Sequence, residues 1–207
     1  MGYSFRGCII FCKFIALKIK IMIYNERDIR NQTVKRLAEA VMAAARTAPK
    51  AKGRDLVEVA MITDEDIERL SQATIQLSQE SGMKFLLRDA ANILEAEAIL
   101  VVGIQSENSE CGLNCGYCGY KSCLEKPACT PCVMNGVDVG IAIGAACSKI
   151  ADYRLDSRVM FSVGWAAKRL DILKGADLVF AIPLSSASKN PFFDRKSPRK
   201  DPPVESK

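Results

Sequence analysis

The sequence predicts a layered domain of helices and strands, of the α/β or α+β class, that carries an inserted cysteine-rich loop. The layers are indicated by apolar runs of strand length that alternate with segments whose apolar residues recur at helical spacing. The insertion is indicated by cysteine density, because six of the nine cysteines fall between positions 111 and 132. That stretch has no apolar core of its own, so bound metal would have to hold it together.

The expected elements follow from apolar spacing and from residues that end helices. Strands are expected at residues 56–63, 98–104 and 176–184. Helices are expected at residues 31–48, 64–81, 85–94, 137–151 and 159–173. Pro49 stops the first helix, and Gly82 suits the left-handed position that ends the second.

A single domain is expected to span residues 22–196, with the cysteine-rich insertion at 109–135. Residues 1–21 are apolar but interrupted by lysines, and no signal-peptide cleavage site follows them. They are too short and too charged to span a bilayer, so we interpret them as a non-native or flexible extension. The alternative is a peripheral anchor at a membrane surface. The polar tail at 197–207 is expected to be disordered.

The net charge of +5 does not predict a nucleic-acid-binding face, because the positive charge is concentrated at the two ends of the chain. Residues 1–22 carry +4 and residues 189–207 carry +3, which leaves residues 23–188 at −2. The chain contains no histidine, which excludes Ser-His-Asp catalysis and histidine-ligated metal sites. Because no convincing sign of export is present, a cytoplasmic location is expected.

The spacing of four cysteines favours an iron–sulfur cluster. Cys115 and Cys118 form a C-x2-C pair that can grip one metal centre from a tight turn, and Gly116 allows the backbone to curl there. Cys123 follows within reach, and Cys132 closes the set beyond a segment that contains two prolines. Four thiolates around a cubane are the usual arrangement of a [4Fe–4S] cluster.

Two other uses of the cysteines remain open. A zinc site would use two C-x2-C pairs and would leave Cys123 without a role. Its ligands would be Cys115, Cys118, Cys129 and Cys132. A disulfide staple would require an oxidising compartment.

The loop that follows the first predicted helix is basic and ends in glycine. It runs from Arg46 to Gly53 and contains Lys50, so it could hold an anionic group. The alternative is structural, because cations at the carboxyl end of a helix interact favourably with its dipole. The residues alone leave both interpretations open.

Three separated motifs occur in order along the chain. They are AAARTAPKA at 43–51, LNCGYCGY at 113–120 with the cysteine at 123, and DVGIAIG at 138–144. Together they resemble an uncharacterised prokaryotic family described as containing a ferredoxin domain, over roughly residues 22–196. The shared region of that family has no assigned function.

The second motif is also similar to the small four-cysteine [4Fe–4S] domain of redox and one-carbon enzyme subunits. That resemblance implies a set of cluster ligands, namely Cys115, Cys118, Cys123 and Cys132. Cys132 is preferred because it directly precedes the start of the next predicted helix. The segment before it is shorter than in the family, so Cys129 or Cys111 could take its place.

The remainder of the chain is similar to the flavin-dependent nitroreductase fold. The resemblance implies an α+β sandwich and a homodimer that binds flavin mononucleotide (FMN) at its interface. The helix and loop that contain Arg46 and Lys50 are similar to those beside the flavin, so these two cations would neutralise its phosphate.

The expected function is electron transfer through a [4Fe–4S] cluster. If FMN is bound, it would exchange a two-electron step for two one-electron steps, which would make the chain a flavin-linked oxidoreductase. The partner would be a ferredoxin or another oxidoreductase subunit. The alternatives are a non-catalytic electron carrier and a zinc-stapled interaction module, so the residues leave open whether the chain is an enzyme.

Overall fold

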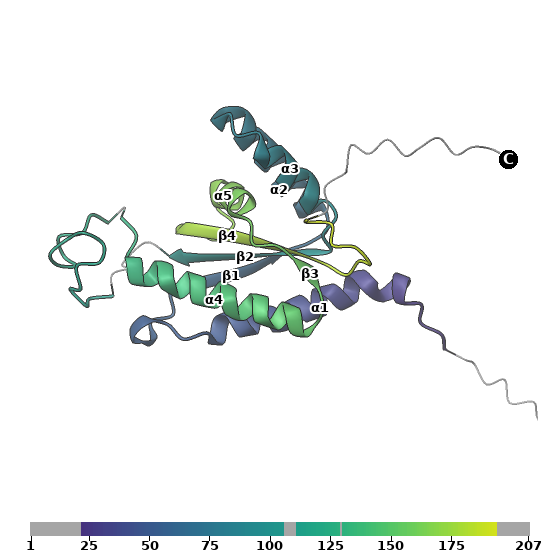
Figure 1. Ribbon diagram of the computed structural model, residues 1–207, viewed down its shortest axis with the longest axis horizontal. Coiled ribbons are helices and arrows are strands. Elements are labelled where there is room, and N and C mark those ends of the chain that lie inside the picture. The colour runs from purple at the N-terminus through teal and green to yellow at the C-terminus, as the bar shows by residue number, and fades with distance from the viewer. Residues whose placement is uncertain (1–21, 106–110, 129, 194–207) are drawn as a thin grey trace, which may run out of the picture.

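The computed structural model describes residues 22–105, 111–128 and 130–193. The expected extension at 1–21, the expected tail at 197–207 and Cys129 lie outside these residues. The described residues form a four-stranded sheet with helices on both faces (Figure 1). Because every strand pair is antiparallel, the fold is α+β rather than α/β.

The strand order in the sheet is β1-β2-β4-β3. The strands are β1 (Val57–Ile62), β2 (Ala98–Gln105), β3 (Asp156–Ser157) and β4 (Ala176–Ser185). One face of the sheet is covered by α1 (Glu26–Thr47) and α4 (Val133–Asp152). The other face is covered by α2 (Glu65–Ser81), α3 (Phe85–Ile93) and α5 (Phe161–Arg169) (Figure 1). A short 3-10 helix follows α1 and is labelled η1 (Ala51–Gly53).

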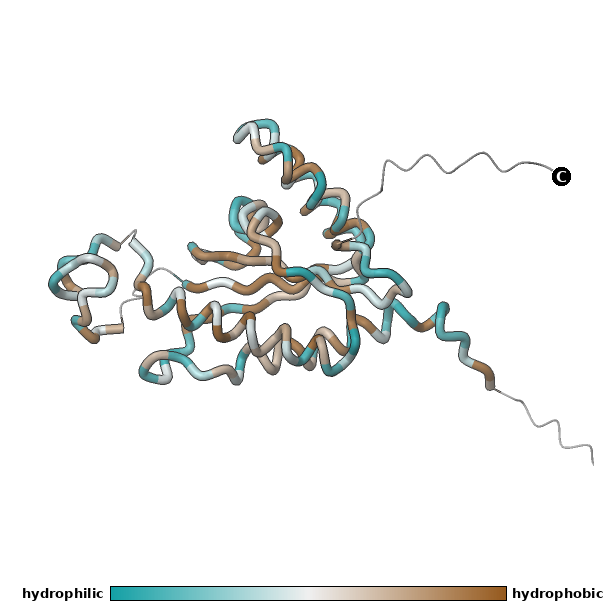
Figure 2. The backbone as a smooth tube through the Cα atoms, viewed as in Figure 1, coloured by the Kyte–Doolittle hydropathy of each residue, from teal (hydrophilic) through white to brown (hydrophobic). Residues whose placement is uncertain are grey.

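Strand β2 joins the two helical layers, because its side chains enter both cores. It lies between β1 and β4, and its side chains alternate between the faces of the sheet. Leu100 and Val102 pack with α1 and α4, whereas Ile99 and Val101 pack with α2, α3 and α5. Figure 2 shows these apolar strands between the helical layers. Each fully buried apolar side chain contributes about 1.5–3 kcal/mol, so the strand stabilises both layers.

Two helices on one face begin earlier than the sequence predicts. Helix α1 begins at Glu26 because the Asn25 side chain caps it, accepting a hydrogen bond from the Arg27 N–H at 3.0 Å. Helix α4 begins at Val133 rather than at 137, so Cys132 lies immediately before its first turn. This position matters for the site, because the amino end of a helix carries partial positive charge.

Helix α4 is the one helix of the described segments that is long and apolar enough, by length and composition alone, to cross a bilayer. In the fold it packs as a core helix, because Val139, Ala142 and Ala146 are fully buried against α1 and the sheet. Its opposite side is exposed and carries Gly140 and Gly144.

Candidate metal centre

The cysteine loop, residues 111–132, projects beyond one end of the sheet and returns at the start of α4 (Figure 1). Its described residues form turns and bends rather than helices or strands. Leu124 and Tyr117 are 92% and 74% exposed. The loop therefore gains little stability from apolar burial.

Five cysteines line one small cavity in this loop, and they are Cys111, Cys115, Cys118, Cys123 and Cys132. All four expected cluster ligands are among them. Cys115 is exposed, Cys118 and Cys123 are half-buried, and the two cysteines at the base of the loop are buried. Every cysteine of the described segments is a free thiol.

The C-x2-C turn uses both of its glycines. Gly116 and Gly119 have φ angles of 74° and 88°, in the region that favours glycine. The Gly119 N–H donates to the Gly116 carbonyl at 2.9 Å and closes the turn. Cys118 therefore lies inside the turn, with Cys115 directly before it.

Asn114 fixes the position of Cys123 through a reciprocal pair of hydrogen bonds. Its backbone N–H donates to the Cys123 Sγ at 3.3 Å, and its side-chain Oδ1 accepts from the Cys123 N–H at 2.9 Å. Asn114 has a φ of 50°, a left-handed conformation that asparagine tolerates better than most residues. The two bonds tie the start of the loop to its middle.

Cys132 lies where backbone amide groups favour its thiolate form. Burial alone would raise the pKa of Cys132, but hydrogen bonds from the backbone of Cys111, Asn135 and Met134 outweigh burial and lower it. The side chain of Cys111 adds a further hydrogen bond. A thiolate at this helix terminus is therefore easier to form than an ordinary cysteine thiolate.

The pKa of Cys111 shifts in the opposite direction, although Cys111 is hydrogen-bonded to Cys132. Burial raises the pKa of Cys111 to about 11, with further contributions from neighbouring Cys132 and the Asp138 carboxylate. Its Sγ lies 2.9 Å from Asn135 Oδ1, so the thiol donates to a buried amide oxygen. The base of the loop thus pairs a thiol that keeps its proton with one that loses it readily.

The thiols around the cavity are the donor type of both zinc sites and iron–sulfur clusters. Among the described residues, no three cysteine or carboxylate groups lie close enough together to hold one metal ion. Tetrahedral zinc, with Zn–S bonds near 2.3 Å, would bring the sulfur atoms to about 3.8 Å from one another. A cubane places each thiolate on a different iron, so its sulfur ligands stand farther apart. Five free thiols around one cavity are the donor type that a cubane requires.

The two cations predicted to neutralise a flavin phosphate lie at the end of α1. Only 6% of the Lys50 side chain is exposed, and its ammonium donates to the carbonyl oxygens of Arg46 and Ala48. Arg46 donates to the Asp55 carboxylate at 2.8 Å and to the Val57 carbonyl at 2.6 Å. Lys50 thus supports the carboxyl end of α1, as the structural alternative expects, whereas Arg46 ties that end to the start of β1. Phosphate binding stays a prediction.

The segment after α1 and the cysteine loop lie against each other. A side chain added at Gly112 would come within 3.8 Å of the Lys52 ammonium. The Ala51 N–H donates to the carboxylate of buried Asp138 at 3.0 Å. The first two turns of α4 therefore follow Cys132 and also bind η1 through Asp138. The basic loop after α1 thus lies next to the cysteine loop.

Four residues that contact the cysteines or the neighbouring segments were not predicted from the sequence. They are Asn114, Lys126, Asn135 and Asp138. Asn114 has a local signal, because asparagine before a C-x2-C pair suits a left-handed turn. The other three act through contacts that only the folded chain creates. Cys147 lies outside the cavity, half-buried against the core, and burial raises its pKa.

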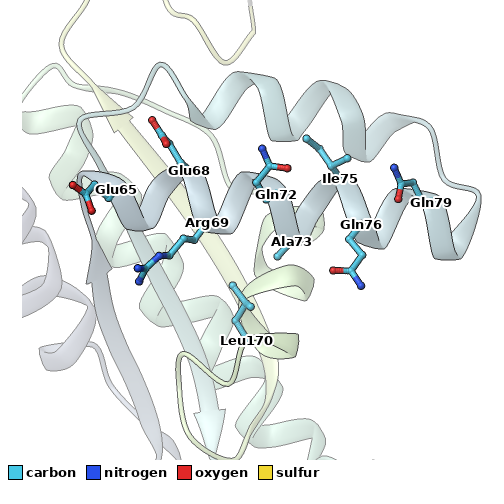
Figure 3. A pocket seen from close by; sticks show the side chains of 9 residues that line it. All are labelled: Glu65, Glu68, Arg69, Gln72, Ala73, Ile75, Gln76, Gln79 and Leu170. Carbon is cyan, nitrogen blue, oxygen red and sulfur yellow. The ribbon is translucent and has the colours of Figure 1, made fainter.

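A second hollow lies along α2 (Figure 3), a helix that covers the opposite face of the sheet from α4. It is open and lined mainly by polar side chains of α2. Its arginine, Arg69, pairs with the Asp66 carboxylate at 2.9 Å. The lining contains no cysteine and no buried charged group, so it offers no chemistry comparable to that of the cysteine cavity.

Comparison with known sequences connects the chain to proteins without an assigned function. The family described as "uncharacterized protein containing a ferredoxin domain" matches residues 128–195, a segment that includes Cys132 but begins after Cys123. An uncharacterized protein of Archaeoglobus fulgidus is 37% identical over 188 residues, covering 86% of this chain and 100% of the relative.

Comparison with solved structures identifies the fold as that of the nitroreductases. Nitroreductase CinD from Lactococcus lactis, in complex with nicotinic acid, has a TM-score of 0.54 at 13% identity, covering 75% of this chain and 79% of CinD. An oxidoreductase containing FMN has a TM-score of 0.52 at 14% identity, covering 75% and 68%. A nitroreductase family protein from Clostridium difficile has a TM-score of 0.50 at 16% identity, covering 76% and 74%.

Proposed function

Because the chain belongs to the family of uncharacterized proteins containing a ferredoxin domain, we propose that it binds a [4Fe–4S] cluster and transfers single electrons. The observation that carries the proposal is the cavity that is lined by five cysteines of the loop. The ligands are Cys115, Cys118, Cys123 and Cys132. The cluster supplies one-electron redox chemistry, and the residues of the chain hold it and set its surroundings.

Cys132 is a better fourth ligand than Cys111, because metals bind the thiolate form of cysteine. Amide groups at the start of α4 favour the Cys132 thiolate, whereas burial keeps Cys111 protonated. Cys111 then acts as a hydrogen-bonding neighbour of the ligand. Cys129 lies outside the described residues, and the test below includes it.

We also propose that FMN binds beside the segment that follows α1. The support is the nitroreductase fold, together with the FMN named for one of the similar structures. When bound, FMN exchanges two-electron for one-electron chemistry. Arg46 is the better candidate for its phosphate, because its ion pairs with Asp55 and Glu58 are exposed and therefore weak, and it would have to release one carbonyl group, that of Val57, whereas Lys50 contacts two. Lys50 would first have to leave the carbonyl groups that it now contacts.

The proposal includes a homodimer and a redox partner protein such as a ferredoxin, in the cytoplasm. A second copy is supported by the exposed side of α4, where no described residue lies close enough to Gly140 or Gly144 to hinder backbone approach. Val137 and Ile141 are 47% and 40% exposed on the same side. Exposed apolar side chains beside glycines are typical of helices that pack against another chain.

Anaerobic purification followed by iron, sulfide and flavin quantification tests the proposal. We expect brown protein with about four iron and four sulfide ions per chain. Cys118→Ala, Cys123→Ala and Cys132→Ala should lose the cluster. Cys111→Ala, Cys129→Ala and Cys147→Ala should keep it and serve as controls. A Cys118→Ala variant with full iron content would show that the ligand assignment is wrong.

The same measurements separate the two alternative functions. Colourless protein that contains zinc would favour the zinc-stapled interaction module. Brown protein that takes up no FMN on reconstitution would favour the non-catalytic electron carrier. The carrier has one observation in its favour, which is that Lys50 is already engaged within the chain.

A further inference from the structure

Lys126 is a buried lysine inside the cysteine loop. It is 9% exposed and lines the same cavity as the five cysteines. Burying an ammonium group removes its hydration, which costs several kcal/mol unless an opposite charge compensates for it. A buried ammonium at this position therefore requires a negative charge nearby.

The contacts of Lys126 with other described residues orient its ammonium without neutralising it. The Nζ donates to the Thr130 carbonyl at 2.6 Å and to the Pro127 carbonyl at 3.3 Å. None of the ion pairs between described residues includes Lys126. Lys50, whose side chain is equally well buried, differs in lying 3.7 Å from the Asp55 carboxylate.

We propose that Lys126 is the counter-charge of the cluster and raises its reduction potential. This inference rests on the proposed function, because the opposite charge is that of four thiolates and the cubane that they hold. Such a cluster carries a net negative charge that increases by one when it accepts an electron, and no proton needs to move. A fixed ammonium at the cavity wall stabilises the reduced form more than the oxidised form.

The alternative role of Lys126 is structural, because the two carbonyl contacts also close the turn between 126 and 130. Three variants separate charge from structure. Lys126→Gln keeps an amide donor but removes the charge. Lys126→Arg keeps the charge. Lys121→Gln removes the charge of an exposed lysine in the same loop and is the control.

The experiment uses the full chain, purified and reconstituted without oxygen. Iron and sulfide content is measured first, and the potential is then determined by titration with dithionite, followed by the electron paramagnetic resonance signal of the reduced cluster. We expect Lys126→Gln to hold a full cluster that is at least tenfold harder to reduce, which corresponds to a potential about 59 mV lower for one electron. Lys126→Arg and Lys121→Gln should remain close to the wild type.

A loaded Lys126→Gln protein with the wild-type potential would overturn the inference and leave the proposed function intact. If Lys126→Gln failed to hold the cluster, Lys126→Arg would separate charge from structure. A Lys126→Arg protein with a full cluster would support the requirement for charge. A Lys126→Arg protein without a cluster would show that the role of Lys126 is structural only, which would overturn the inference. A wild type that takes up no iron and sulfide would instead refute the proposed function itself.

Discussion

Residues Ala98 to Val102 of β2 are fully buried, whereas Tyr117 and Leu124 of the cysteine loop leave most of their surface in water. The β2 residues contact both helical layers and two neighbouring strands. The loop is held by hydrogen bonds between a few residues, such as those between Asn114 and Cys123. The sandwich is therefore stabilised by its own buried apolar side chains. Under the proposed function, a bound cluster would supply most of the stability of the loop.

This difference predicts that the two regions respond to different changes. Substitutions that disturb close packing should affect the sandwich, and loss of metal should affect the loop. Four changes test how the regions of the molecule respond, beginning with the one that is expected to have the largest effect.

The largest effect is expected for Gly164→Ala in α5. A Cβ at this position would lie 2.5 Å from the Phe180 Cα and would also clash with the Val179 carbonyl, so α5 would have to move away from β4. We expect a loss of about 3 kcal/mol in the free energy of unfolding, measured by urea denaturation. Gly103→Ala is the matched control, because its Cβ meets only side-chain atoms, at 3.0 Å or more. Equal losses in the two variants would contradict the backbone clash.

The second effect concerns metal removal. Chelation of iron should expose residues 111–132 to proteolysis and to hydrogen exchange, because the cluster is expected to supply most of that segment's folding free energy. The amides of β2 and β4 should keep their protection, since their partners lie within the sheet. Cys118→Ala should behave like chelated wild type. If the strands lost protection together with the loop, the two regions would be one cooperative unit.

A smaller effect is expected for Asn114→Gly. Glycine keeps the left-handed backbone but loses the hydrogen bond from the Cys123 N–H, which should cost about 1 kcal/mol. The variant should release iron to a chelator several-fold faster than the wild type. Asn114→Asp keeps an acceptor oxygen for this bond and should release iron more slowly than Asn114→Gly. Identical release from all three proteins would mean that Asn114 does not position Cys123.

The smallest effect is expected for Asp55→Asn, which weakens an exposed ion pair with Arg46. Its effect on the free energy of unfolding should be within about 0.5 kcal/mol. If Arg46 binds the FMN phosphate, releasing it should tighten FMN binding, measured by quenching of flavin fluorescence. Arg46→Gln should weaken the same binding. Weaker binding in Asp55→Asn would argue against Arg46 as the phosphate ligand.

The sandwich could be predicted well because its signals are local. The apolar runs at 56–63, 98–104 and 176–184 are β1, β2 and β4, with ends shifted by a few residues. The short β3 escaped prediction, because two polar residues, Asp156 and Ser157, carry no strand pattern and owe their conformation to pairing with β4. The start of α4 was misplaced because Cys132 is not one of the usual N-cap residues.

The site was only partly predictable. Spacing alone placed the C-x2-C pair in a tight turn, because glycine at 116 and 119 permits that conformation wherever it occurs. Spacing could not show that Lys126 turns into the cavity, or that Asp138 holds the Ala51 N–H, because these contacts join segments whose approach depends on the whole fold. The same limitation applies to Arg46 and Lys50, whose partners became visible only in three dimensions.

The contact between Cys111 and Cys132 closes the cysteine loop at its base, where both residues are buried. What lies between them can thus change in length without altering the distance that the rest of the chain must span. The twenty positions from 112 to 131 thus form an insertion whose two ends are fixed by Cys111 and Cys132. Under the proposed function, one metal-binding insert could be exchanged for another, by evolution or by design, while the sandwich stays the same.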